Sequence, residues 1–454
     1  MQKILTRIFK LDERKAKISE EIIAGIIAFF AILYTLPVNS SLIAKSGISV
    51  TSAFTTIALT CAISTFLVGI VTNRPFIVGF GAGMNTFFVY TLTTTLGYTW
   101  QEGLSIILIT SIIFFILSIS GLRTKIIDAI DPNLKAAISA ALGLFLAFIG
   151  LNMGGIIVRD DAGLIKLGSL DNPLVLLSLF GIFLVLILSS LKGKISRFAI
   201  IIAMLTTALF GFILGLLNVE NMPKFDFSLK VNFKETPFVA FFNFGVLKNL
   251  KTYIVIISCL FIELFDATGS LVAIGSDLNL LSEDGKLIDG KKIMVADATA
   301  QLITNSLGGL SAITFAESAI AAKNGGKTGL TSCVISILML FTLIAYPLFS
   351  IFSPVTVNGE SFSPTSALAL IYVGIMLFSN IEKIDFKSPI IAFTSFIIIT
   401  MTIFSYSLVN GLGMGFTIYV LLMLVNKKGK DVNFIIYLIS LLYIFSFVID
   451  YLLV

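Results

Sequence analysis

The chain has 454 residues, of which 57% are hydrophobic and 13% are charged, and its formal net charge is +5. Soluble domains are about a quarter charged, so this composition excludes an ordinary soluble protein and indicates a protein of the lipid bilayer. The small net charge gives no support for nucleic-acid binding. A chain with no histidine and three cysteines has no cluster suited to zinc. We expect no metal and no cofactor, and any proton relay has to use Asp, Glu, Tyr or water.

The chain begins with a basic arm and continues into a first series of apolar segments. The arm, residues 1–20, has no small-residue cleavage site, so we expect no cleavable signal peptide. The apolar segments that follow within residues 21–217 are mostly near the length that crosses a bilayer, about 20 residues. They cover residues 22–44, 50–71, 76–96, 103–120, 134–157, 173–191 and 198–217. A more polar connecting loop is expected at 218–250.

A second series of apolar segments occupies residues 251–426 and repeats the spacing of the first. Its members cover residues 251–275, 291–308, 310–322, 329–353, 363–379, 388–405 and 407–426. Because each series has an odd number of segments, the second copy should run through the membrane in the opposite direction. The sequence therefore predicts an all-α polytopic membrane protein of about fourteen transmembrane spans, built from two inverted repeats of about seven spans each. Residues 427–454 add a basic segment and an extra apolar helix, and charge does not decide whether this helix crosses the membrane.

The distribution of basic residues indicates how the chain is oriented. With a cytoplasmic N-terminus, most of the 31 lysine and arginine residues fall in cytoplasmic loops. Arg123, between the fourth and fifth apolar segments, is among them. Because cytoplasmic loops are enriched in these residues, the pattern supports a multi-pass protein of the cell inner membrane with its N-terminus in the cytoplasm.

The third segment of each series is interrupted by glycines. These segments, spans 3 and 10, read GFGAGMNTFF at 79–88 and TFAESAIAAKNGG at 314–326. A helix in hydrocarbon should be continuous, because each freed backbone group needs a partner where water is absent. Interrupted segments at corresponding places of two halves point to the substrate site of a secondary transporter.

Acidic residues inside apolar segments are costly and therefore candidates for a substrate or proton site. Glu317 lies in the second break, and Asp266 lies in the segment at 251–275. Glu263 precedes Asp266 by three residues, on the same helical face. Asp297, in the next segment, either couples protonation to motion or bonds neighbouring spans, and we slightly favour the structural role.

Several motifs in order resemble the AzgA-type purine permeases of the nucleobase–cation symporter-2 group. They are GFGAGMNTFF at 79–88, ELFDATGSLVA at 263–273, ADATA at 296–300 and FAESAIAAKNGGKTGLTS at 315–332. The resemblance extends over nearly the whole chain. It implies a fold in which a core domain combines spans 1–4 with 8–11, and a gate domain combines spans 5–7 with 12–14.

The resemblance also implies roles for individual residues. Asp266 and Glu317 occupy the positions of the family's acidic residues, and Asn85 occupies a polar position of the first break, where an amide can both donate and accept hydrogen bonds. Phe315 is placed to stack on a flat base, and Gly83 allows the backbone to approach it. The expected substrate-binding set is Asn85, Asp266, Phe315, Glu317, Phe80 and Gly83, and the proton-coupling candidates are Asp266, Glu317, Glu263 and Asp297. The alternative for Asn85 is a helix–helix bond, and for Phe315 it is packing.

This chain departs from the family pattern at three places. Phe80 stands where the family has proline, Lys323 and Asn324 stand in a glycine-rich turn, and Ser40 replaces a proline. We expect the Phe80 ring to line the pocket, with packing against lipid or a neighbouring helix as the alternative. Lys323 is expected at the cytoplasmic mouth.

The sequence therefore indicates a transporter, not an enzyme. The expected function is proton-coupled uptake of purine bases (hypoxanthine, guanine or adenine) by alternating access, with the proton inherited from the resemblance. A homodimer is compatible with this interpretation. One alternative is a uracil, xanthine or anion carrier of the same architecture. A remote alternative is an intramembrane aspartyl protease, whose YD and GxGD signatures are missing.

Overall fold

The described part of the chain folds into a bundle of helices with three short strand pairs. A computed structural model describes residues 2–160, 165–228, 230–231, 242–275, 278, 280–282, 286–357 and 359–453. Within these residues nine helices are long and apolar enough to cross a membrane, and one bent pair, Gly329–Ile344 with Tyr346–Phe352, would add a tenth. The number of fourteen spans stays a prediction, because the remaining segments are shorter or broken.

The elements of the first half follow the apolar segments expected from the sequence. In order they are α1 (Gln2–Phe9), α2 (Ile18–Ile32), α3 (Thr35–Ala44), α4 (Val50–Thr72), β1 (Val78–Phe80), α5 (Ala82–Thr86), the π-helix η1 (Phe87–Thr95), α6 (Trp100–Ile119), α7 (Leu122–Ala129), α8 (Pro132–Met153), β2 (Ile157–Arg159), β3 (Ile165–Leu167), α9 (Pro173–Ser190), α10 (Lys194–Arg197) and α11 (Ala199–Leu216). Proline at the first position of α8 and α9 marks where these helices begin, since its missing N–H needs no partner there.

The second half repeats this order. Its elements are the 3₁₀ turn η2 (Phe244–Lys248), α12 (Leu250–Gly275), α13 (Gly290–Ser306), β4 (Ala312–Thr314), α14 (Ser318–Lys323), α15 (Gly329–Ile344), α16 (Tyr346–Phe349), η3 (Ser350–Phe352), β5 (Val355–Val357), β6 (Glu360–Phe362), α17 (Pro364–Phe378), η4 (Ser379–Lys383), α18 (Pro389–Phe404), α19 (Leu408–Val425), η5 (Gly429–Asp431) and α20 (Phe434–Leu453). Here α17 and α18 begin at proline, as their counterparts α8 and α9 do.

Helix packing is reciprocal between the two halves, as inverted copies require. The helix α4 packs on α15, and their counterparts α13 and α6 pack on each other. In the same way α8 packs on α18 while α9 packs on α17, and α8 and α17 also contact each other. The predicted inverted repeat is therefore visible in the contacts between helices.

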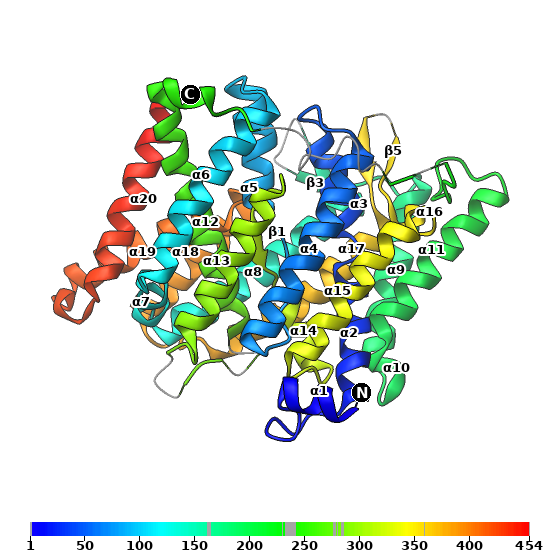
Figure 1. Ribbon diagram of the computed structural model, residues 1–454, viewed down its shortest axis with the longest axis horizontal. Helices are drawn as coiled ribbons and strands as arrows, with labels where there is room; N and C mark the ends of the chain where they lie inside the picture. Colours follow the sequence, from blue (N-terminus) through cyan, green and yellow to red (C-terminus); the bar gives the residue numbers. More distant parts are fainter. Residues whose placement is uncertain are drawn as a thin grey trace.

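The packing separates two groups of helices that match the expected core and gate. In the core group α2, α4, α6, α12, α13 and α15 pack together; in the gate group α8, α9, α11, α17, α18 and α19 do so. The groups meet where α12 contacts α8 and α19, and where α2 contacts α11 and α17. The last helix, α20, packs on α19 at one edge of the molecule (Figure 1).

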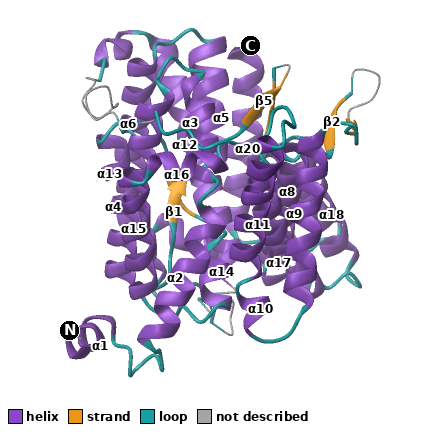
Figure 2. Ribbon diagram, turned by 90° about the vertical axis from the view of Figure 1, so that its right-hand side faces the viewer, coloured by secondary structure: helices purple, strands orange, loops and turns teal. Residues whose placement is uncertain are grey.

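The two predicted breaks become an antiparallel strand pair near the middle of the bundle (Figure 2). Val78 pairs with Thr314, Gly79 with Ile313, and Phe80 with Ala312. Beyond the strands, the Phe315 N–H donates to the Ile77 carbonyl at 2.8 Å and the Gly81 N–H to the Ser311 carbonyl at 3.0 Å. The strands therefore satisfy each other's backbone groups where a broken helix would leave them unpaired in an apolar interior.

Candidate functional site

Glu317 lies where β4 passes into α14, at the centre of the molecule. Its side chain is only 3% exposed. The Tyr34 hydroxyl donates a hydrogen bond to its Oε1 atom at 2.7 Å, from the junction between α2 and α3. A buried carboxylate needs such partners, because burial without a hydrogen bond is costly. The sequence does not single out Tyr34, since its partner is 283 residues away.

The Phe315 ring lies against the backbone of the first break. A Cβ atom built on Gly79 would lie 2.3 Å from Cζ and 2.4 Å from Cε2 of Phe315, well inside ordinary contact. Phe315 itself is buried, at 9% exposure. Only glycine at position 79 leaves room for the ring in this place, so the aromatic residue of one break rests on the glycine of the other.

Asp266 reaches the first break from α12. Its Oδ2 atom is 2.8 Å from a Cβ built on Gly81 and 3.2 Å from one built on Gly83. This oxygen has no side-chain hydrogen-bond partner within the described part of the chain. Gly83 is exposed and Asp266 is only partly buried, although both belong to the interior of the bundle. A buried acceptor atom is therefore directed at the glycine backbone of the first break.

Asn85 adds an amide to the same region. It is fully buried on α5, and neither its Oδ1 nor its Nδ2 atom has a partner among the residues that the structure describes. Buried polar side chains are normally hydrogen-bonded, and a side chain without a partner is explained by an ordered water, an ion or a functional role. The amide offers both a donor and an acceptor.

Phe80 does not join this group. The tip of the Phe80 ring lies 3.0 Å from a Cβ built on Gly309, in the turn after α13, while the adjacent Gly79 faces Phe315. Successive side chains of a strand point to opposite faces, so Phe80 is directed away from the Phe315 side. Glu263 is fully buried on α12, beside Gln301 of α13, and stays a candidate for proton coupling.

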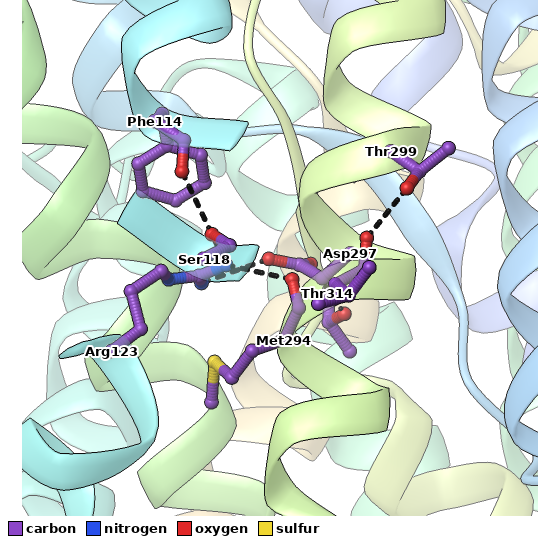
Figure 3. A network of polar contacts seen from close by, with 8 residues as sticks. Phe114, Ser118, Arg123, Met294, Asp297, Thr299 and Thr314 are labelled. Carbon is purple, nitrogen blue, oxygen red and sulfur yellow. Dashed lines mark hydrogen bonds and ion pairs between the residues drawn. The ribbon is translucent and has the colours of Figure 1, made fainter. Parts of the chain in front are cut away.

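Asp297 is bound into an ion pair that the sequence does not reveal. The Arg123 Nη2 atom donates to Oδ2 of Asp297 at 2.9 Å, and both side chains are fully buried (Figure 3). The charge pattern predicts Arg123 in a cytoplasmic loop. It lies on the short helix α7 that follows α6, and its side chain turns inward, which the charge pattern does not anticipate.

A cavity of about 530 Å³ opens where the core group meets the gate group at the end of α14. Its lining includes Glu20, Lys323, Asn324, Tyr372 and Met376. Lys323 donates from Nζ to the Met376 carbonyl at 3.1 Å and so bridges α14 of the core to α17 of the gate. In Figure 1, α14 lies toward the same end of the bundle as the N-terminus, so Lys323 and the N-terminus are on the same side of the molecule.

Comparison with known proteins identifies the class of this site. A model described as a permease family matches residues 19–441. The chain belongs to this permease family. The resemblance expected from the motifs is confirmed, and the protease alternative is wrong. Permeases are membrane transporters, so the chain is a multi-pass transport protein and not an enzyme.

Relatives of this permease align along almost its full length. The guanine/hypoxanthine permease PbuG of Bacillus subtilis is 31% identical over 454 residues, covering 97% of this chain and 98% of the relative. The guanine/hypoxanthine permease PbuO of the same organism is 28% identical, covering 96% and 98%. The adenine permease AdeP of Escherichia coli is also 28% identical, covering 98% and 96%.

Solved structures confirm the fold at low sequence identity. The transmembrane domain of the cyanobacterial bicarbonate transporter BicA aligns with a TM-score of 0.55 at 14% identity, covering 87% of this permease and 97% of that domain. The inward-facing murine anion transporter Slc26a9 aligns with a TM-score of 0.55 at 12% identity, covering 90% and 68%. At such identity the likeness concerns the fold alone.

Proposed function

We propose that this permease carries purine nucleobases, with guanine, hypoxanthine and adenine as candidates. The observation that carries the proposal is the convergence of four chemistries on the paired breaks. These are an aromatic ring at Phe315, a free amide at Asn85, and carboxylates at Asp266 and Glu317. A purine is flat and carries N–H donors and acceptors on its edges, so one ring, one amide and two acceptors suit it. The names of PbuG, PbuO and AdeP support this choice.

Each residue has a distinct part in the proposed complex. The base stacks on the Phe315 ring, its N–H groups donate to Asp266 and Glu317, and Asn85 binds a further edge. Gly79 makes room for the Phe315 ring, and Gly83 keeps the neighbouring backbone free of a side chain, which lets the base approach. Tyr34 holds the Glu317 carboxylate in one orientation.

The same carboxylates support coupling to protons. A negative carboxylate at the centre of a bilayer is unfavourable, so its protonation accompanies movement of the site across the apolar layer. Asp266 is the main candidate, because Oδ2 makes no side-chain hydrogen bond in the described ranges. The core group would then move against the gate group in the inner membrane, with the N-terminus in the cytoplasm, and expose the base to each side in turn.

An anion carrier is the second candidate, since BicA and Slc26a9 share the fold. The side chains argue against it. Asp266 and Glu317 would repel an anion, and no salt bridge to either carboxylate occurs among the described residues. A uracil or xanthine carrier differs only in the shape of the base, so competition has to separate these substrates.

The test is uptake of radiolabelled hypoxanthine in a host that lacks its own purine transport. Unlabelled adenine, guanine, xanthine and uracil compete, and an uncoupler or a sodium gradient identifies the driving ion. Glu317→Gln should abolish uptake at matched membrane expression, and Glu360→Gln, at an exposed hairpin, should not. Normal uptake by Glu317→Gln would contradict the assignment of the site, and sodium-driven accumulation insensitive to uncoupler would contradict the proton.

A further inference from the structure

The short helix α7 connects the core helix α6 to the gate helix α8. Any movement between the two groups has to be accommodated along this connector. Arg123, in its first turn, is fully buried beneath it. A buried guanidinium is retained only where its charge and its N–H groups find partners, so these partners show what the connector is attached to.

Within the described part of the chain, the hydrogen bonds and the ring contact of the Arg123 guanidinium are to helices of the core group. Nη1 donates to the Ser118 hydroxyl on α6 and to the Met294 carbonyl on α13, each at 3.2 Å. Nη2 donates to Asp297 at 2.9 Å, and the guanidinium carbon lies 4.2 Å from the centre of the Phe114 ring. The planar fork of arginine is thus held by a carboxylate, a carbonyl, a hydroxyl and an aromatic face.

Asp297 links Arg123 to the strand pair of β1 and β4. Its Oδ2 atom is taken by Arg123, and its Oδ1 atom accepts a hydrogen bond from the Thr314 hydroxyl at 2.9 Å (Figure 3). Thr314 is the last residue of β4 and pairs with Val78 of β1. Phe315 follows it directly, with its N–H bonded to Ile77.

We propose that Arg123, Asp297 and Thr314 form a clamp that positions β4 for substrate and ties the connector α7 to the core. Asp297 is then a positioning residue, with one carboxylate oxygen bonded to a guanidinium and the other to a hydroxyl, and it does not carry the transported proton. A clamp of this kind keeps Phe315 and Glu317 in place while the chain beyond α7 moves. The part that concerns substrate rests on the proposed function.

The spacing along β4 makes the clamp specific to the site. The clamped residue, Thr314, is one residue before the ring of Phe315 and three before the carboxylate of Glu317. Loss of its hydroxyl leaves strand pairing with β1 intact but removes the bond that fixes the strand against α13. The expected effect is a poorly ordered binding surface, not an unfolded protein.

Thr314→Val and Thr314→Ser form the matched pair that tests the clamp. Valine has nearly the shape of threonine without the hydroxyl, whereas serine keeps the hydroxyl. We expect Thr314→Val to raise the KM for hypoxanthine about tenfold, the usual scale for a hydrogen bond to a charged group, with little change in maximal rate. Thr314→Ser should stay within about twofold of the wild type.

A second measurement does not depend on the substrate. Hydrogen–deuterium exchange of the peptide that covers residues 312–317 should be faster in Thr314→Val than in Thr314→Ser, with exchange in α9 equal in both. If both variants match the wild type in this exchange, the clamp is refuted, whatever the protein transports. A wild type that takes up no purine but shows the exchange difference would contradict the proposed function and leave the clamp supported.

Asp297→Asn decides between positioning and proton transfer. The clamp predicts a raised KM with accumulation still sensitive to uncoupler, and Arg123→Lys should show the same pattern, since lysine keeps the charge but not the fork. If Asp297→Asn keeps a normal KM but loses accumulation against a gradient, Asp297 carries the proton and the proposal is overturned. If it does not fold, the Thr314 pair still decides.

Discussion

Replacement of Gly79 by alanine tests the contact between the two breaks most directly. The new Cβ atom would lie 2.3 Å from Cζ of Phe315, whereas ordinary contact begins at 3.4 Å, so the ring has to retreat by about 1 Å. The Phe315 backbone is held in place because its N–H is bonded to the Ile77 carbonyl, so the ring has to retreat by rotation of the side chain. The substitution should therefore displace the ring from the base.

The magnitude follows from what stacking contributes. Stacking of a base on an aromatic side chain is worth about 1–3 kcal/mol, which corresponds to roughly 5- to 150-fold in affinity. We expect Gly79→Ala to raise the KM for hypoxanthine by about tenfold or more, and Phe315→Ala to do the same. Gly275→Ala is the matched control, because a Cβ there would meet Leu281 at an ordinary 3.4 Å.

A double-mutant cycle separates this effect from a general loss of stability. If Gly79→Ala acts through the ring, it should cost little in the Phe315→Ala background, where the ring is absent. Uptake of labelled hypoxanthine over a range of concentrations, at expression matched by immunoblot of the membrane fraction, gives the four KM values. Equal costs of Gly79→Ala with and without the Phe315 ring would refute the reasoning.

Three further substitutions have distinct expected outcomes. Phe80→Ala should lower expression and thermal stability but leave the inhibition order of adenine, guanine and hypoxanthine unchanged, because its ring packs toward Gly309; a changed order would return Phe80 to the pocket. Glu21→Ala should lower the unfolding temperature of the purified protein without altering KM, because the buried carboxylate accepts the Lys327 N–H at 2.9 Å just before α15. An unchanged unfolding temperature would show that this hydrogen bond does not stabilise the fold. Lys323→Met should increase maleimide labelling of a cysteine placed at Ser196, in the cavity lining, because the hydrogen bond between α14 and α17 is lost, whereas Lys323→Arg should not. The three native cysteines are buried and give a low background. Equal labelling of the two variants would show that this hydrogen bond does not restrict access to the cavity.

The sequence was sufficient where the chemistry is local. Glycines inside apolar segments predicted both breaks, and the placement of acidic residues in hydrocarbon marked Asp266 and Glu317 as site candidates. Neither inference needs a partner to be known, because the cost of a broken helix or a buried charge is a property of the segment itself.

The sequence was insufficient where a role depends on a distant partner or on direction. Tyr34 and Arg123 acquire their roles from Glu317 and Asp297, which lie 283 and 174 residues away in the chain. From the sequence, Phe80 is expected in the pocket because it stands beside the glycines of the first break, where the family has proline. The break forms a strand, and the alternation of a strand turns adjacent residues to opposite sides.

The register of the central strand pair has a consequence for how this site arose. Counting outward from Gly79 and its partner Ile313, the successive odd positions after β1 are Gly81 and Gly83, and those after β4 are Phe315 and Glu317. The two halves share a fold but differ in side chains here: the first break has glycines at these positions, and the second has an aromatic ring and an acid. The inverted repeat therefore presents an unsymmetrical surface at its centre, which suits the flat, unsymmetrical base that we propose as the ligand.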